Sequence, residues 1–159
     1  MFLSHDAILE RIEKQKLLEN IQPRAVQGAG VDLRIDKLFK LESGGFIGVN
    51  DRKLPEIAEV KPALEPGSYY LFTTIERVNV PDDLVAFMLN RSSLFRCGAS
   101  LRTAVIDPGY KGVLTVGIKN EGTHEILLEK GSRILQIVFS DVKEGTRGYD
   151  GRYQGGKVI

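Results

Sequence analysis

Hydrophobic and polar residues alternate along many short stretches of this chain, and the alternation predicts β-strands. In VDLRID, residues 31–36, every second residue is apolar, as in a half-buried strand whose other face is polar. Similar β-rich runs cover residues 46–49, 57–60, 69–78, 84–89, 104–107, 113–119, 124–128 and 133–139, with Gly- or Pro-containing turns between them. Many short strands with such turns predict a mainly β protein, a sandwich or barrel of jelly-roll type.

The two ends of the chain depart from this pattern. Ser4 is a suitable N-cap for a helix through about residue 19, with Ala7, Ile8, Ile12 and Leu18 broadly on one side. From residue 143 the sequence KEGTRGYDGRYQGGKVI has five glycines and few core candidates, so we expect a mobile C-terminal tail over 143–159. Because no repeat or linker lies between the helical segment (1–20) and the tail, we expect one domain over 1–159.

Composition and charge exclude several classes of function. Among 159 residues, 22 Lys and Arg stand against 21 Asp and Glu, and this net charge of +1 favours neither nucleic acid nor an anionic membrane as a partner. The longest apolar run, LVAFML at 84–89, is far shorter than the roughly 20 residues of a membrane helix. The first residues lack the pattern of a signal peptide, and Cys97 is the single cysteine. We therefore expect a soluble, cytoplasmic protein in which Cys97 is a small buried hydrophobe.

Two familiar kinds of ligand site are not supported by the sequence. His5 and His124 stand alone, with no partner at the spacing of a zinc site, so we expect no metal caged by protein ligands. The segment GRYQGGKV, residues 151–158, has the glycine and lysine spacing of a phosphate-binding loop, but Val158 stands where that loop has Ser or Thr. The segment is therefore not interpreted as a phosphate-binding loop.

Three stretches carry side chains suited to chemistry, although each also has a purely structural interpretation. NRSSLFRCG, residues 90–98, offers guanidinium groups and hydroxyls that suit phosphate oxygens, or it forms a capped helical turn with solvated arginines. In GAGVDL, residues 28–33, Asp32 follows a loop whose glycines allow close backbone approach, yet an aspartate on the polar face of a strand is usually only solvated. Asp107, in VIDPGYKG, is either a chemical group or a partner of the turn backbone.

The order of these stretches adds information that none carries alone. GAGVDL, RSSLFRCG, VIDPGYKG, GSRILQIVF and a Gly-rich tail with aromatic residues resemble the five ordered motifs of the trimeric dUTPase and dCTP deaminase superfamily. The segment LEPGSYYLFTTIERVNVPDDL and the N-terminal helix are similar to the deaminase branch and its bifunctional relatives. The resemblance covers roughly residues 28–156. It implies a homotrimer of distorted jelly-roll (dUTPase-like β-clip) subunits, with active sites at subunit interfaces that the tails close.

The resemblance also implies roles for individual residues. Asp107 matches the carboxylate that activates the water attacking the α-phosphate in dUTPases, and Asp32 matches a residue that holds Mg²⁺ through water. Tyr110 would stack under the deoxyribose, where a 2′-hydroxyl would collide. The backbone of Thr103, Ala104 and Ile106 would contact the pyrimidine, and Gln136 would contact the substrate or the phosphate motif. The triphosphate would be held by Arg91, Ser92, Ser93 and Arg96, and its outer phosphates by Arg152. The nucleotide would be covered by Tyr149, Tyr153 and Gln154.

One departure from the superfamily pattern separates two reactions. In the deaminases and bifunctional enzymes of this resemblance, a glutamate ten residues after the aspartate shuttles protons at C4 of cytosine, whereas this chain has Gly117. Glycine has no side chain to act as an acid or base, although it also suits a bulge or a close backbone contact. We therefore expect a dUTP diphosphatase that uses Mg²⁺ and produces dUMP and pyrophosphate. The alternatives are a dCTP deaminase or bifunctional enzyme with a relocated acid/base, and a regulatory trimer that binds nucleotide without turnover.

Overall fold

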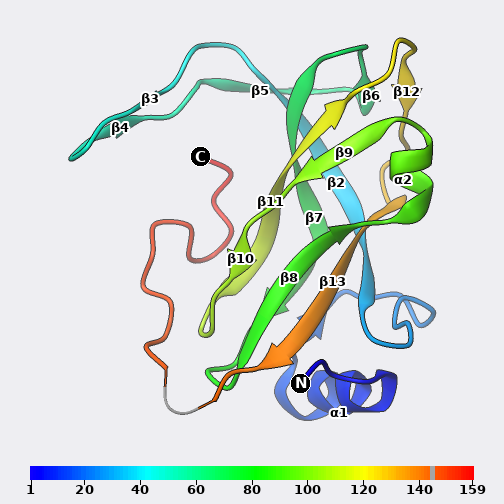
Figure 1. Ribbon diagram of the computed structural model, residues 1–159, viewed down its shortest axis with the longest axis vertical. Coiled ribbons are helices and arrows are strands. Elements are labelled where there is room, and N and C mark those ends of the chain that lie inside the picture. The colour runs from blue at the N-terminus through cyan, green and yellow to red at the C-terminus, as the bar shows by residue number, and fades with distance from the viewer. Residues whose placement is uncertain (144–145) are drawn as a thin grey trace.

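The structure, a computed structural model that describes residues 1–143 and 146–159, is mainly β, as the sequence predicts (Figure 1). Two helices precede or interrupt the strands, α1 (His5–Gln15) and α2 (Ser92–Arg96). The strands are β1 (Leu18–Glu19), β2 (Val31–Leu41), β3 (Phe46–Ile47), β4 (Arg52–Lys53), β5 (Ile57–Val60), β6 (Ala63–Leu64), β7 (Tyr69–Asn79), β8 (Leu84–Asn90), β9 (Ala99–Arg102), β10 (Val105–Ile106), β11 (Lys111–Asn120), β12 (Ile126–Leu127) and β13 (Arg133–Asp141).

Most strands join one antiparallel sheet. Its order is β10-β8-β13-β2-β7-β11-β9, with β1 attached to β7 and β5 attached to β2, which makes nine strands within the described residues. Two small two-stranded sheets, β6 with β12 and β3 with β4, lie outside it. The sheet curls into a half-barrel, while β3 and β4 project from it as an arm (Figure 1).

The strand pattern in the sequence agrees with the structure. Each β-rich run contains a strand, and the runs at 69–78, 84–89, 113–119 and 133–139 become the long strands β7, β8, β11 and β13. The structure adds β1, β4, β6 and β9, which the pattern does not predict. These strands have two to four residues, too few to show a repeat of period two.

The N-terminal helix begins as predicted and ends early. Ser4 caps α1 by accepting a hydrogen bond from the backbone N–H of Ala7 at 3.4 Å. The helix ends at Gln15 rather than near residue 19, because Lys16 adopts the left-handed conformation, with φ of 54°. Leu18 is therefore buried from strand β1 and not from the helix. Neither α1 nor α2 has the length and apolar composition to cross a bilayer, within the residues described.

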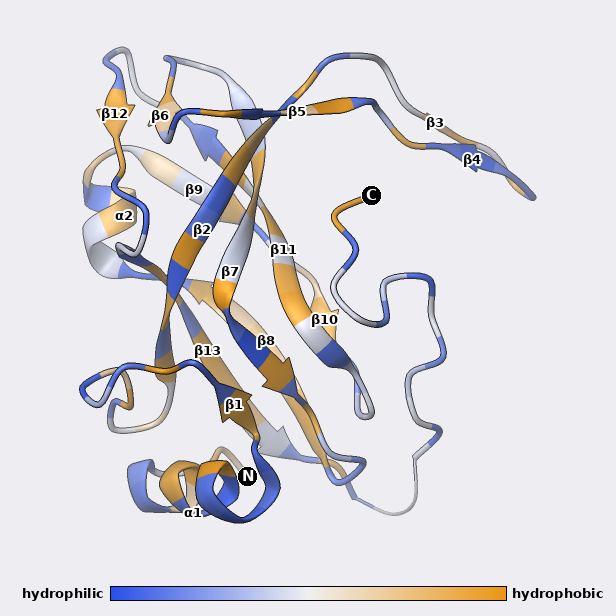
Figure 2. Ribbon diagram, turned by 180° about the vertical axis from the view of Figure 1, so that it is seen from behind, coloured by the Kyte–Doolittle hydropathy of each residue, from blue (hydrophilic) through white to orange (hydrophobic). Residues whose placement is uncertain are grey.

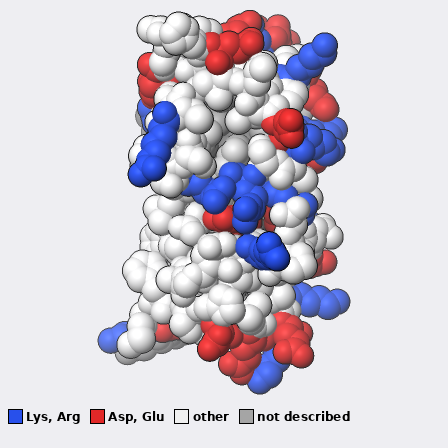
Figure 3. Space-filling model, turned by 90° about the vertical axis from the view of Figure 1, so that its right-hand side faces the viewer, with Lys and Arg blue, Asp and Glu red and all other residues white. Residues whose placement is uncertain are grey.

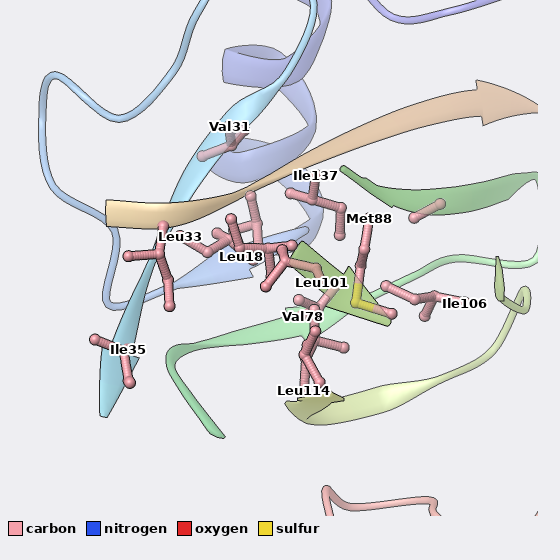
Figure 4. Close-up of a cluster of buried hydrophobic side chains, with 14 of the residues drawn as sticks. Leu18, Val31, Leu33, Ile35, Val78, Met88, Leu101, Ile106, Leu114 and Ile137 are labelled. Carbon is pink, nitrogen blue, oxygen red and sulfur yellow. The ribbon is translucent and has the colours of Figure 1, made fainter. Parts of the chain in front are cut away.

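The core fills the inside of the curled sheet. Figure 2 shows hydrophobic and hydrophilic residues alternating along β2, and Figure 4 shows how the apolar residues of this strand meet those of the strands around it. Val31, Leu33 and Ile35 are fully buried, and Ile137 from β13 is fully buried beside them. The packing of these side chains removes apolar surface from water and holds the sheet in its curled form.

The polar face of β2 is also covered at the start of the strand, which the sequence pattern does not predict. Asp32 is only 2% exposed, so the interpretation that it is a solvated strand residue is wrong. Two positions further on, the Nε of Arg34 donates to Glu76 at 2.6 Å, and Glu76 is fully buried. Burial of a carboxylate requires a charged or hydrogen-bonding partner, and arginines supply it in both cases.

Cys97 is exposed, so the expectation of a small buried hydrophobe is wrong. The residue follows α2, a five-residue helix that has one buried residue, Leu94. A helix of this length buries a single side chain against the sheet, and its C-terminal end stays at the surface.

Candidate active site

Asp107 is exposed and lines a cavity of about 420 Å³, which we call the Asp107 cavity. The turn after β10 fixes its place: the backbone N–H of Tyr110 donates to the carbonyl of Asp107 at 3.2 Å, and Gly109 has a φ of 83° that favours glycine. The cavity has the size of a small-molecule site and a mainly apolar wall. Five other residues expected at the site also line it: Ala104, Ile106, Tyr110, Tyr149 and Tyr153.

Tyr110 is held firmly at the wall of the Asp107 cavity. It is 8% exposed, and its hydroxyl donates to the carbonyl of Val113 at 2.6 Å. Its ring meets that of Tyr149 edge to face, with centroids 5.6 Å apart. Burial, and to a smaller extent the nearby Tyr149, raises the pKa of Tyr110 to about 12. Tyr110 is therefore a neutral, rigid wall and not an acid or base near neutral pH.

The C-terminal segment lies along the start of β11 and closes one side of the cavity. The side-chain amide of Gln154 accepts from the N–H of Lys111 at 2.8 Å and donates to the carbonyl of Gly109 at 3.0 Å. Gly155 forms a parallel bridge with Gly112. A Cβ added to Gly112 would lie 2.7 Å from the carbonyl carbon of Gly155. Gln154 thus fastens the segment to the turn. Arg152 is exposed and does not line the Asp107 cavity.

A second group of expected residues surrounds Asp32. The Nε of Arg91 lies 3.1 Å from one carboxylate oxygen of Asp32, and a guanidinium nitrogen of Arg133 lies 3.5 Å from the other. Arg91 also donates to the carbonyl of Arg133 at 2.9 Å. Figure 3 shows Lys and Arg side chains gathered near the middle of the face that carries α2. We call Asp32, Arg91 and Arg133 the arginine group.

Sequence reasoning missed Arg133, although it lies within the quoted motif GSRILQIVF. Ser92, Ser93 and Arg96 are exposed on α2, directly after Arg91. Gln136 is opposite Asp32 in the pairing of β13 with β2. The guanidinium and hydroxyl groups at this end of β8 suit the oxygens of a phosphate chain.

Asp32 does not fit the expected role of holding Mg²⁺ through water. Both of its oxygens face guanidinium groups and its side chain is 3% exposed, so its negative charge is already used to orient two arginines. Among the residues described, no three His, Cys, Asp or Glu side chains cluster in a way that would hold a metal ion.

The Asp107 cavity and the arginine group lie at opposite ends of β8. Ile106 pairs with Ala86, which places Asp107 at the level of Val85, whereas Arg91 follows the other end of the strand. Six residues of extended chain span about 20 Å. Figure 1 shows α2 and the turn after β10 at the two ends of β8. One copy of the chain therefore does not bring Asp107 next to the expected phosphate-binding residues. Thr103 also does not line the Asp107 cavity.

Gly117 makes a close contact in the sheet, as glycine within a strand often does. It is paired with Leu71 on one side and Arg102 on the other. A Cβ at this position would lie 2.9 Å from the Cζ of Tyr69 and 3.0 Å from the Cβ of Arg102. Sequence reasoning missed Tyr69, because only the register of β7 on β11 brings it over Gly117.

Comparison with known proteins shows which proteins the chain as a whole is similar to. The model of a family described as dCTP deaminase-like matches residues 2–142. The chain is 36% identical over 146 residues to the probable deoxyuridine 5′-triphosphate nucleotidohydrolase of Methanothermobacter thermautotrophicus, an alignment that covers 88% of this chain and 97% of that protein. It is also 36% identical over 151 residues to the dCTP deaminase of Thermococcus gammatolerans, which covers 94% of this chain and 90% of that protein.

A solved structure supports the fold. The 2′-deoxycytidine 5′-triphosphate deaminase from Agrobacterium tumefaciens superposes with a TM-score of 0.70 at 23% identity, over 87% of this chain and 48% of that chain. The present chain thus spans about half the length of that deaminase. This likeness shows the dUTPase-like fold, a distorted jelly roll with a short N-terminal helix, that the sequence predicts.

Proposed function

The chain belongs to the dCTP deaminase-like family, and we propose that within this family it is a dUTP diphosphatase, hydrolysing dUTP to dUMP and pyrophosphate. Its relatives are named for two activities, so it is a nucleotide-metabolising enzyme of the dUTPase or dCTP deaminase type. The observation that carries the choice is the pairing of an exposed Asp107 in the cavity with Gly117, which has no side chain to act on cytosine.

Asp107 is the proposed general base. Its carboxylate takes a proton from a water molecule, whose oxygen attacks the α-phosphorus of dUTP while the bond to the bridging oxygen of pyrophosphate breaks. The products are dUMP and pyrophosphate, and the water supplies the oxygen that dUMP gains. Holding the water and the phosphate in line supplies much of the acceleration in reactions of this kind.

The arginine group and α2 are the proposed binding site for the phosphates. Arg91, Ser92, Ser93 and Arg96 would contact the triphosphate, and Asp32 would keep the Arg91 guanidinium oriented. Since Asp32 does not fit a magnesium ligand, we propose that Mg²⁺ enters as the counter-ion of the dUTP phosphates, which are its preferred ligands in nucleotide sites. No step of the reaction above depends on a metal held by this chain.

We propose that the functional unit is a homotrimer of single-domain subunits in which one copy supplies the Asp107 cavity and a neighbouring copy supplies the arginine group. Asp107 as the general base and Arg91 as a phosphate contact must both reach the triphosphate of one nucleotide. Their separation of about 20 Å along β8 within one copy therefore supports a site formed by two copies. Closed rings are the usual form of homo-oligomers with such head-to-tail contacts.

A deaminase with a relocated acid is the second candidate, since relatives of similar identity carry that name. Glu121 is near Gly117 in sequence, but its carboxylate accepts from Ser100 at 2.8 Å and pairs with Arg102 at 2.8 Å and Lys119 at 3.0 Å. Hydrogen bonds from Ser100 and Lys119 lower the pKa of Glu121, which is the opposite of what a proton-donating acid needs. These contacts favour the diphosphatase.

The test is incubation of the purified protein with dUTP or dCTP, with Mg²⁺ or with EDTA, followed by anion-exchange chromatography of all nucleotides. We expect dUTP to yield dUMP and pyrophosphate, and dCTP to persist. Formation of dUTP or dUMP from dCTP would overturn the assignment in favour of the deaminase. Tight binding of dUTP without release of pyrophosphate would favour the regulatory trimer.

A further inference from the structure

Tyr69 occupies the space that a side chain at position 117 would fill. β7 and β11 pair with Tyr69 opposite Lys119 and Leu71 opposite Gly117, so Tyr69 and Gly117 are diagonal neighbours on one face of the sheet. A Cβ on Gly117 would lie 2.9 Å from the Cζ of Tyr69 and closer still to its hydroxyl oxygen. The position of the ring therefore requires glycine at 117.

Tyr69 also belongs to the wall of the Asp107 cavity. It lines the cavity together with Leu71, Thr115 and Asp107, whereas Gly117 beneath it does not. The residue is 39% exposed, so its ring is partly open to the cavity and to solvent. The sheet thus presents a phenol at the place where residue 117 would otherwise present its own side chain.

The hydroxyl of Tyr69 is free to bind a ligand. Within the described residues no hydrogen bond to it is recorded, whereas the hydroxyl of Tyr110 donates to Val113, and those of Tyr70 and Tyr149 accept backbone N–H groups. Gly117 has no side chain that could accept the phenolic proton.

We propose that Tyr69 is a specificity-determining residue, whose hydroxyl donates to O4 of uracil and so favours uracil over cytosine. The proposal rests on the proposed function in one respect, that the pyrimidine enters the Asp107 cavity. A tyrosine hydroxyl is both a donor and an acceptor, and O4 of uracil is a carbonyl oxygen that accepts a hydrogen bond from it. The C4 amino group of cytosine is a donor, so the hydroxyl could only accept from it, and the phenolic proton would lose the nucleobase as its acceptor.

The contact between Tyr69 and Gly117 also gives glycine a second role. A larger residue at 117 would push the phenol away from the cavity wall, so Gly117 keeps the Tyr69 hydroxyl in place as well as omitting an acid. The selection of uracil and the absence of an acid/base at position 117 are then two results of one contact.

Equilibrium binding in a background that does not turn over substrate tests the proposal. The Kd values of dUTP and dCTP are measured by calorimetry for Asp107→Asn and for Asp107→Asn with Tyr69→Phe, which keeps the ring over Gly117 and removes only the hydroxyl. We expect the preference for dUTP over dCTP to fall roughly fivefold to tenfold in the Phe variant. The matched control is Lys119→Ala in the same background, because Lys119 is the next residue on that face and does not line the cavity.

Two outcomes would overturn the proposal: an unchanged preference in the Tyr69→Phe variant, or an equal loss in the Lys119→Ala control. Failure of the proposed function is seen separately, as the absence of dUTP hydrolysis by the unmodified protein. Since the binding comparison needs no turnover, a uracil preference that depends on Tyr69 would support the proposal even in a protein that does not hydrolyse dUTP. Chromatography of the bound nucleotide after each titration confirms that it stayed intact.

Discussion

Arg91 and Asp32 form an ion pair in which only the arginine reaches solvent: the Nε of Arg91 lies 3.1 Å from the Oδ1 of Asp32, and their side chains are 30% and 3% exposed. Arg133 approaches the second oxygen of the same carboxylate at 3.5 Å. The buried charge thus fixes two guanidinium groups at the end of β8, before any phosphate arrives. Pre-ordered donors bind an anion with less loss of side-chain entropy than free arginines.

Replacing Asp32 by Asn should therefore affect both stability and substrate binding. We expect the free energy of unfolding to fall by about 1–3 kcal/mol, because two guanidinium groups lose their buried anion, although both remain partly solvated. Urea denaturation measures the stability, and KM for dUTP should rise. Asp36→Asn is the control, since its partner Lys130 is 66% exposed, and its cost should stay within about 1 kcal/mol. Equal effects of the two variants would contradict the role given to Asp32.

The two-copy active site predicts complementation between inactive variants. Asp107→Asn should lose about 10²–10⁴-fold in kcat because the amide takes no proton from water, and Arg91→Ala should lose affinity for the phosphates. When equal amounts of the two variants are refolded together, a site is intact only where a copy that keeps Asp107 lies next to a copy that keeps Arg91. Random assembly gives this arrangement at about one quarter of the sites, so about a quarter of the activity should return. Refolding each variant alone is the control. No recovery in the mixture would mean that both residues act within one chain.

Gln154→Ala should loosen the C-terminal segment. The side chain makes hydrogen bonds of 2.8 Å to Lys111 and 3.0 Å to Gly109, and their loss should raise KM for dUTP roughly tenfold. Trypsin should also cleave after Arg152 sooner, because the segment spends more time away from the turn. Asp150→Asn, an exposed change in the same segment, is the control. Kinetics and cleavage equal to those of the unmodified protein would show that Gln154 does not fasten the segment.

The raised pKa of Tyr110 predicts a loss of stability at high pH. Burial lifts the pKa from 10.0 to about 12 in the folded state, so between these values the unfolded chain binds fewer protons and stability falls as pH rises. The stabilisation is fully present below about pH 10, and up to about 2–3 kcal/mol is lost by about pH 12. Tyr110→Phe should reduce this slope, although it also loses the bond to Val113. Urea unfolding of both proteins at each pH compares them, and parallel curves would contradict the prediction.

Gly117→Ala should destabilise the protein through Tyr69. The added methyl meets Tyr69 Cζ at 2.9 Å and Arg102 Cβ at 3.0 Å, and such overpacking costs about 1–3 kcal/mol. In a Tyr69→Ala background the cost should be much smaller, and the difference is the coupling free energy of the pair. Gly44→Ala is the control, since no atom lies within 4 Å of its Cβ position. Additive effects at 69 and 117 would show that the two residues do not interact.

The long strands and the start of α1 are predictable because the residues that determine them are close together in the sequence. Alternating burial gives the long strands, and the Ser4 cap gives the start of α1. The end of α1 was predicted too late, since the left-handed turn at Lys16 has no glycine to signal it. Cys97 was wrongly placed in the core, because α2 is too short to bury more than Leu94.

The site depends on contacts between distant parts of the chain, and these limit what the sequence predicts. The motifs identify Asp107 and residues of the cavity wall, but the burial of Asp32 depends on Arg91, which follows β8, and on Arg133 at the start of β13. The position of Tyr69 over Gly117 depends on strand register, which no local repeat encodes.

The fastening of the C-terminal segment has a consequence for variation among related chains. Gln154 contacts the peptide groups of residues 109 and 111, and Gly155 meets the backbone of Gly112. Because every residue except proline offers the same amide, the side chain at position 111 is free to change without loss of this docking. Position 112 has no such freedom, since a Cβ there would lie 2.7 Å from the carbonyl carbon of Gly155, so docking of the tail constrains the glycine of this turn and not the neighbouring lysine.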